Sequence, residues 1–107
     1  AVPEGSLIFP REPLVKVVAP IMEAQLIETA ILNIVNHQCL IATKAARVCY
    51  AAKGDNVMEF GLRRAQGPDS GTYGARAAVI GAAALPMFSP VRCSMCRYSA
   101  HMPTAGS

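Results

Sequence analysis

The sequence predicts an α/β fold, and three observations lead to that class. Residues 20–53 carry apolar side chains at helical spacing, residues 56–60 form a short β-prone run, and residues 72–83 resume a helical pattern after a polar loop. Alternation of helix, strand, loop and helix is typical of α/β architecture, in which the strands are usually parallel. We therefore expect a helix pair, a short strand, a loop and a further helix.

The chain begins with a segment that cannot be helical. Pro3, Pro10 and Pro13 favour extended or turn geometry there. Residues 14–19, with the sequence LVKVVA, are short and rich in β-branched side chains, so they predict a strand.

The next element is a long helical stretch. Pro20 stands where a helix tolerates proline, at its first turn, and Gly54 is well placed to end the helix. A break near residues 36–37 would divide this stretch into a helix pair. The apolar stripe that predicts it comprises Ile27, Ala30, Ile31, Ile34, Ile41, Ala45, Val48, Cys49 and Ala52.

Composition excludes several classes of function. The chain has 107 residues, 52% of them hydrophobic and 16% charged, which is typical of one globular domain. Its net charge is +3 and its basic residues are scattered, so nucleic acid is not an expected partner. The apolar run at residues 77–88 falls short of the roughly 20 residues that cross a bilayer. With no signal peptide in view, we expect reduced, buried Cys39 and Cys49 and a cytoplasmic location.

The loop that follows residues 56–60 is the best candidate for chemistry. It carries the adjacent Arg63 and Arg64, and a guanidinium matches a carboxylate or phosphate with two parallel donors. Glu59 and Gln66 are candidates to support these arginines. Asp69 or Ser70 could cap the next helix, whose first amides favour anions. The alternative is that both arginines are solvated surface charges paired with Glu59 or Asp69.

Other polar residues have simpler explanations. His37, near the expected break, is more often a hydrogen-bonded structural residue than a ligand. Lys44 and Arg47 form a basic helix face that is usually solvated, although a lysine could face a ligand of the loop. We therefore assign no catalytic role to these side chains.

Several motifs together resemble one enzyme family. NHQCLIATKAARV, MEFGLRRAQGPD and ARAAVIG are similar to nicotinate phosphoribosyltransferases, and REPLVKVVAPIMEAQLIETAILNIVN is similar to the segment that precedes those motifs. The resemblance covers about residues 6–81, and EFGLRRAQGPD is its most specific part.

The resemblance implies a fold and an activity. The fold would be a fragment of the irregular α/β barrel of type II phosphoribosyltransferases, with residues 1–82 entering that barrel. The enzyme joins nicotinate to phosphoribosyl pyrophosphate, giving nicotinate mononucleotide and pyrophosphate, and it is coupled to hydrolysis of ATP, with Mg as a further cofactor and a homodimer as the complete form. Arg63 and Arg64 would contact the nicotinate carboxylate or the phosphates, in an order that the motif does not fix.

The resemblance stops at about residue 83, and our hypothesis is that the residues from there onward are a frameshifted translation. Where the family continues with Thr-Ser-Asn-Val-Leu-Ala-Gly-Lys and then Gly-Thr-x-Ala-His-Ser, this chain has a different tail. If each true codon joins the last base of one codon to the first two of the next, Met87–Phe88 and Met95–Cys96 must encode valine, and Met102–Pro103 must encode alanine. All three fall where the family has them.

A shifted frame has consequences for function. The family's phosphorylated histidine is then absent, so we expect no catalytic residue, no activity from these 107 residues alone, and a disordered tail over residues 83–107. The alternative is a small module that binds zinc through Cys93 and Cys96, with His101 nearby, although a structural zinc site needs four ligands. A third interpretation makes residues 20–53 an oligomerisation surface that leaves Ile27 and Ile31 exposed in a monomer.

Overall fold

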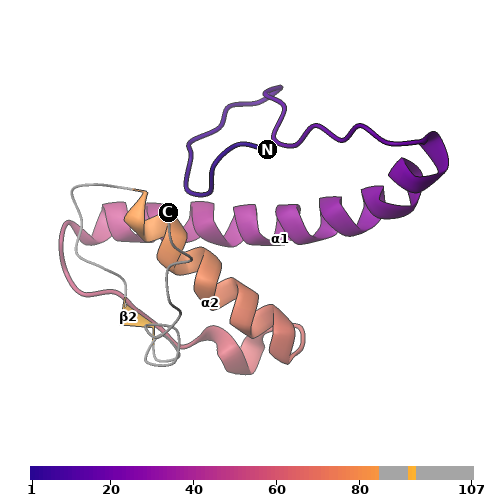
Figure 1. Ribbon diagram of the computed structural model, residues 1–107. Helices are drawn as coiled ribbons and strands as arrows, with labels where there is room; N and C mark the ends of the chain where they lie inside the picture. The colour runs from indigo at the N-terminus through magenta and orange to yellow at the C-terminus, as the bar shows by residue number, and fades with distance from the viewer. Residues whose placement is uncertain (85–91, 94–107) are drawn as a thin grey trace, which may run out of the picture.

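The computed structural model describes residues 1–84 and Arg92–Cys93. Figure 1 shows one long helix, α1 (Ile21–Ala52), with an irregular N-terminal segment along one side of it and a second helix, α2 (Pro68–Ala83), crossing the other. Between the helices lie the strand β1 (Met58–Glu59) and a 3₁₀ turn, η1 (Gly61–Arg64). The helical part of the α/β prediction is confirmed.

Helix α1 runs without interruption, so the predicted break at residues 36–37 is wrong. The segment contains neither proline nor glycine between Ile21 and Ala52, and nothing else in it removes a backbone hydrogen bond. Pro20 precedes the first turn as expected. The helix ends with Lys53 in the left-handed conformation (φ 49°), followed by Gly54 at φ 101°.

Strand content is smaller than the sequence suggests. The strand predicted at residues 14–19 is absent, because no described segment forms a ladder with it: one backbone bond to it runs from the amide of Val2 to the carbonyl oxygen of Leu14, at 2.9 Å. The strand predicted at residues 56–60 is reduced to β1. It pairs in parallel with β2 (Arg92–Cys93), Met58 opposite Arg92 and Glu59 opposite Cys93. The remaining residues of the predicted tail lie outside the described part of the chain.

The core lies where α2 crosses the C-terminal half of α1. Its buried residues are small: Cys49 on α1, and Gly74, Ala75, Ala77, Ala78, Gly81 and Ala82 on α2. A Cβ added to Gly81 would overlap the carbonyl oxygen of Ala42 and lie 2.7 Å from its carbonyl carbon, so the two backbones touch at this point. Small side chains on both helices permit this close approach.

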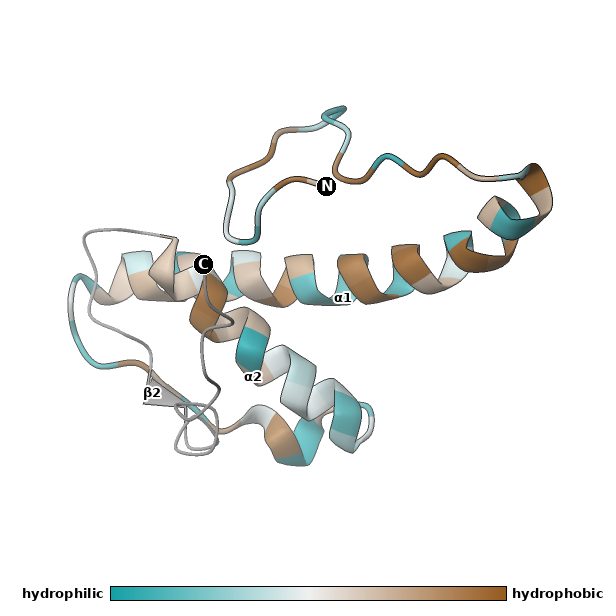
Figure 2. Cartoon of the chain, viewed as in Figure 1, coloured by the Kyte–Doolittle hydropathy of each residue, from teal (hydrophilic) through white to brown (hydrophobic). Residues whose placement is uncertain are grey.

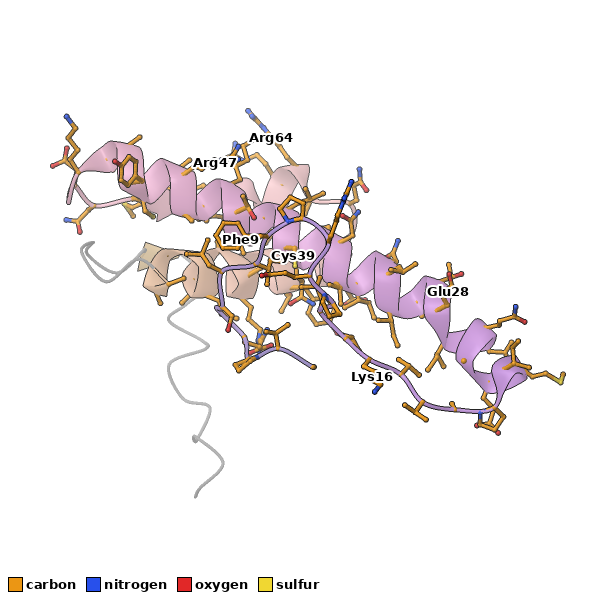
Figure 3. All side chains as sticks on the ribbon, turned by 90° about the horizontal axis from the view of Figure 1, so that it is seen from above. Phe9, Lys16, Glu28, Cys39, Arg47 and Arg64 are labelled. Carbon is orange, nitrogen blue, oxygen red and sulfur yellow. The ribbon has the colours of Figure 1, made fainter. Side chains whose placement is uncertain are left out.

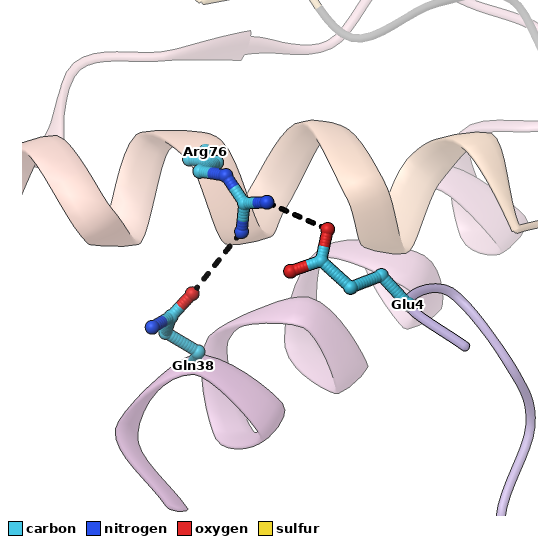
Figure 4. A network of polar contacts seen from close by, with 3 residues as sticks. All are labelled: Glu4, Gln38 and Arg76. Atoms are coloured by element: carbon cyan, nitrogen blue, oxygen red, sulfur yellow. Dashed lines mark hydrogen bonds and ion pairs between the residues drawn. The ribbon is translucent and has the colours of Figure 1, made fainter. Parts of the chain in front are cut away.

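The N-terminal segment is tied to both helices by one cluster (Figure 4). Arg76 of α2 donates to the carboxylate of Glu4 at 2.6 Å and to the side-chain oxygen of Gln38 on α1 at 3.5 Å. The segment also approaches α2 at Gly5, where an added Cβ would lie 3.7 Å from the side chain of Ile80. Residues far apart in the sequence therefore meet around one arginine.

Candidate functional site

The candidate loop is built from the end of β1 to the first turn of α2. Glu59 is half-buried, and its carboxylate accepts a hydrogen bond from the amide of Gly61, which turns the chain from β1 into η1. Leu62 then packs on α2, because a Cβ on Gly71 would overlap its side chain and would lie 3.5 Å from the Cβ of Ala65. These contacts hold η1, and thus both arginines, against the start of α2.

The turn into α2 depends on glycine. Gly67 has φ 96° and ψ 160°, a region that L-residues with a Cβ rarely adopt. Pro68 follows as the first helical residue, and no side chain caps the helix. The prediction that Asp69 or Ser70 caps it is therefore wrong by two or three residues, because Gly67 takes the N-cap position and Pro68 already starts the helix.

Arg63, Arg64 and Gln66 all lie exposed on this loop. Within the described residues neither guanidinium forms an ion pair, and both the ligand role and the surface alternative stay predictions. Figure 3 shows Arg64 projecting from the molecule on the same side as Arg47 of α1. Exposed guanidinium groups of this kind can donate to a carboxylate or a phosphate without first breaking an internal ion pair.

His37 is a structural residue, as the sequence indicates. Its Nε2 lies 3.0 Å from the hydroxyl of Ser70, which joins the middle of α1 to the first turn of α2. The contact is partly buried and connects residues 33 positions apart. It fixes the helix that follows the arginine loop relative to α1.

A second basic surface lies on α1 itself, and sequence reasoning missed its shape. A shallow, largely open depression lies on one side of the helix, away from Ala42 and Cys49, which face α2. Lys44 and Arg47 are exposed there, and neither has an ion-pair partner among the described residues. The sequence signal that could have revealed it is the helical spacing of three or four residues between its lining side chains, from Leu40 to Ala51. Its lining comprises Leu40, Thr43, Lys44, Arg47, Val48 and Ala51.

The cysteines divide between core and surface. Cys49 is buried as predicted, whereas Cys39 is exposed, so that half of the prediction is wrong. Both are free thiols. No cluster of three histidine, cysteine or acidic side chains exists within the described ranges. Cys96 and His101 lie outside those ranges, and for Cys93 only the backbone is described, so the zinc alternative stays a prediction.

Several of the curated proteins most similar in sequence to this chain are nicotinate phosphoribosyltransferases. Nicotinate phosphoribosyltransferase from Bacillus subtilis is 58% identical over 78 residues, which cover 73% of this chain and 16% of the relative. A relative from Mycobacterium tuberculosis, named nicotinate phosphoribosyltransferase pncB2, is 51% identical over 84 residues, which cover 78% of this chain and 18% of the relative. One from Bos taurus is 53% identical over 72 residues, 66% of this chain and 13% of the relative.

The matched lengths have two consequences. This chain spans less than a fifth of the length of these curated relatives. At least a fifth of this chain is left unmatched in each of them. No protein-family model matches the chain, and no solved structure matches it. In the described residues no helix is long and apolar enough to cross a membrane.

Proposed function

We infer that this chain, which is homologous to a segment of the nicotinate phosphoribosyltransferases, is part of an enzyme of NAD biosynthesis. The proposed reaction joins nicotinate to phosphoribosyl pyrophosphate, releases pyrophosphate and is coupled to ATP hydrolysis. The identity of 49–58% to relatives from bacteria and animals, all of that name, carries the proposal. An irregular α/β barrel, a homodimer and a cytoplasmic location belong to the same proposal.

The arginine loop supplies the anion contacts in this proposal. Both substrates are anions, and Arg63 and Arg64 offer exposed guanidinium groups that are not occupied by ion pairs within the described part of the chain. Glu59 and Gly67 shape the loop, and Leu62 anchors it on α2. The loop is thus held in position while its cationic ends stay accessible, an arrangement that favours binding without a large ordering cost.

Mg and ATP enter only as proposed cofactors of the complete enzyme. No group of three metal-ligating side chains lies within the described residues, and we assign no ligand of Mg to this chain. The family's phosphorylated histidine is likewise not matched by His37, which bonds to Ser70.

The first test is to sequence the coding DNA across the codons for residues 82–85. A missing or extra base would restore a frame that continues into the Gly-Thr-x-Ala-His-Ser motif, and we call that longer product the parent enzyme. We expect it to form nicotinate mononucleotide from both substrates, and the 107-residue chain to form none. A confirmed frame together with stoichiometric zinc in the purified chain would instead support the zinc module.

The arginines are tested in the parent enzyme. Arg63→Ala and Arg64→Ala should each raise KM for an anionic substrate at least tenfold, because removing a charge-assisted bidentate contact costs about 1.5–3 kcal/mol. Lys16→Ala is the matched control: it removes one exposed positive charge from the N-terminal segment, where Figure 3 places it. Equal kinetics for all three variants would reject the anion role of the loop.

A further inference from the structure

The N-terminal half of α1, residues 21–36, exposes an unusual amount of apolar surface. Leu26 is 80% exposed, Met22 76% and Ile21 74%, and no part of α2 covers them. Figure 2 shows that the most hydrophobic stretch of α1 is the half that extends beyond α2. The contacts with α2 involve His37, Ile41, Ala42 and Cys49, all in the other half.

The exposed apolar side chains do not form a single stripe. At about 100° per residue, Leu26, Leu32 and Ile34 point in three well-separated directions around the helix axis. They are 80%, 60% and 55% exposed. A helix that is apolar on several sides is typical of the interior of a larger protein, whereas an ordinary surface helix is apolar on one side.

The polar residues of this half fit burial. Glu23 and Glu28 are its charged residues, and Gln25, Thr29, Asn33 and Asn36 are uncharged, so few ions would have to leave water. The adjoining segment is similar, with Val18 86% exposed beside the start of α1. Depletion of charge marks permanent contacts rather than transient ones.

We propose that residues 21–36 form an internal helix of the parent enzyme, surrounded by polypeptide that lies outside this chain. The occupant is the remainder of the same protein, since its relatives are more than five times as long as the matched segment. A second copy docking as one surface would cover one side and leave the others in water. The inference rests on the proposed function only in requiring that a longer polypeptide exists.

The test is cysteine labelling in the parent enzyme. Leu26→Cys, Leu32→Cys and Ile34→Cys are each made in a background with Cys39→Ser and Cys49→Ala, and maleimide modification is followed by peptide mass mapping. We expect all three thiols to react at least a hundredfold more slowly in the folded parent enzyme than in urea, and rapidly in the 107-residue chain. Protection should not change when the parent enzyme is diluted.

Three results would overturn the proposal. Fast labelling of any one position in the folded parent enzyme would show an open side, and protection lost on dilution would identify a second copy as the cover. A confirmed reading frame and a stable monomer with residues 21–36 accessible would remove the parent altogether.

If a variant fails to fold, amide exchange of residues 21–36 in the unsubstituted parent enzyme replaces it. Turnover is measured on the same preparations, so protected thiols without activity would reject the proposed function alone.

Discussion

Gly81 determines how closely the two helices approach. Its Cα faces the backbone of Ala42, and a Cβ there would lie 2.8 Å from the Ala42 Cα. Gly74 lies two turns earlier on the same face of α2, but its neighbour is different. A Cβ there would lie 3.1 Å from the end of the flexible Ile41 side chain. The two glycines are therefore a matched pair with different neighbours.

Replacing these glycines by alanine should have opposite effects on the parent enzyme. Either change favours the helix by about 1 kcal/mol. Gly81→Ala must in addition push two backbones apart, and overpacking costs about 1–3 kcal/mol, so we expect a net loss of up to about 2 kcal/mol and a lower apparent Tm. Gly74→Ala should leave Tm unchanged or raise it, because the Ile41 methyl can move. Thermal scans at one protein concentration measure both, and an equal or higher Tm for Gly81→Ala would contradict the close approach.

At the residue scale the sequence predicted identities better than roles. The motif MEFGLRRAQGPD singled out Arg63 and Arg64 before any geometry, and both are exposed on a shaped loop. It did not reveal that Gly67 provides the turn at φ 96° or that Leu62 fills the space beside Gly71. Those roles depend on how η1 sits on α2, a tertiary contact that local spacing does not encode.

Elements were predictable where their stability is local. Helix α1 follows from its apolar spacing and from the absence of helix breakers, and the break expected near His37 does not occur because no proline or glycine interrupts the backbone hydrogen bonds there. The strand expected at residues 14–19 fails for the opposite reason. A strand needs a partner with which it forms a ladder, and no described segment pairs with residues 14–19 in this way.

The contact between the N-terminal segment and α2 should be weak. Glu4 and Arg76 are 67% and 49% exposed, and solvated ion pairs contribute about 0.2–1 kcal/mol. In the parent enzyme, a double-mutant cycle of Glu4→Ala and Arg76→Ala on the free energy of unfolding should give a coupling in that range. The coupling should fall further in about 1 M salt, where charges are screened within ~3 Å.

Gln38→Ala provides the control for this contact. Arg76 also donates to Gln38 at 3.5 Å, so Arg76→Ala removes two contacts and Glu4→Ala only one. Arg76→Ala should therefore lower the free energy of unfolding more than Glu4→Ala does. A coupling above about 2 kcal/mol between Glu4 and Arg76, unaffected by salt, would show that the pair is shielded from water and that the N-terminal segment is a fixed part of the fold.

The molecule as a whole has a small interior. The buried apolar residues among those described are Cys49, Ala75, Ala77, Ala78 and Ala82, and no large side chain among them is fully buried. Burial of apolar surface stabilises a fold by roughly 25 cal/mol per Å². An alanine side chain buries little apolar area, so each one contributes little. Fixing the backbone costs about 1–2 kcal/mol for each ordered residue, so packing of this kind cannot stabilise a domain of this length.

We therefore expect no cooperative unfolding of the 107-residue chain. Its helical signal at 222 nm should decline gradually with temperature, calorimetry should show no heat-absorption peak, and a dye that binds exposed apolar surface should fluoresce already at 20–25 °C. The parent enzyme should show a sharp transition, because its additional chain would cover residues 21–36 and enlarge the core. A calorimetric peak from the 107 residues, with equal van't Hoff and calorimetric enthalpies, would contradict this expectation, since it would mean that the small α1–α2 interface suffices for two-state folding.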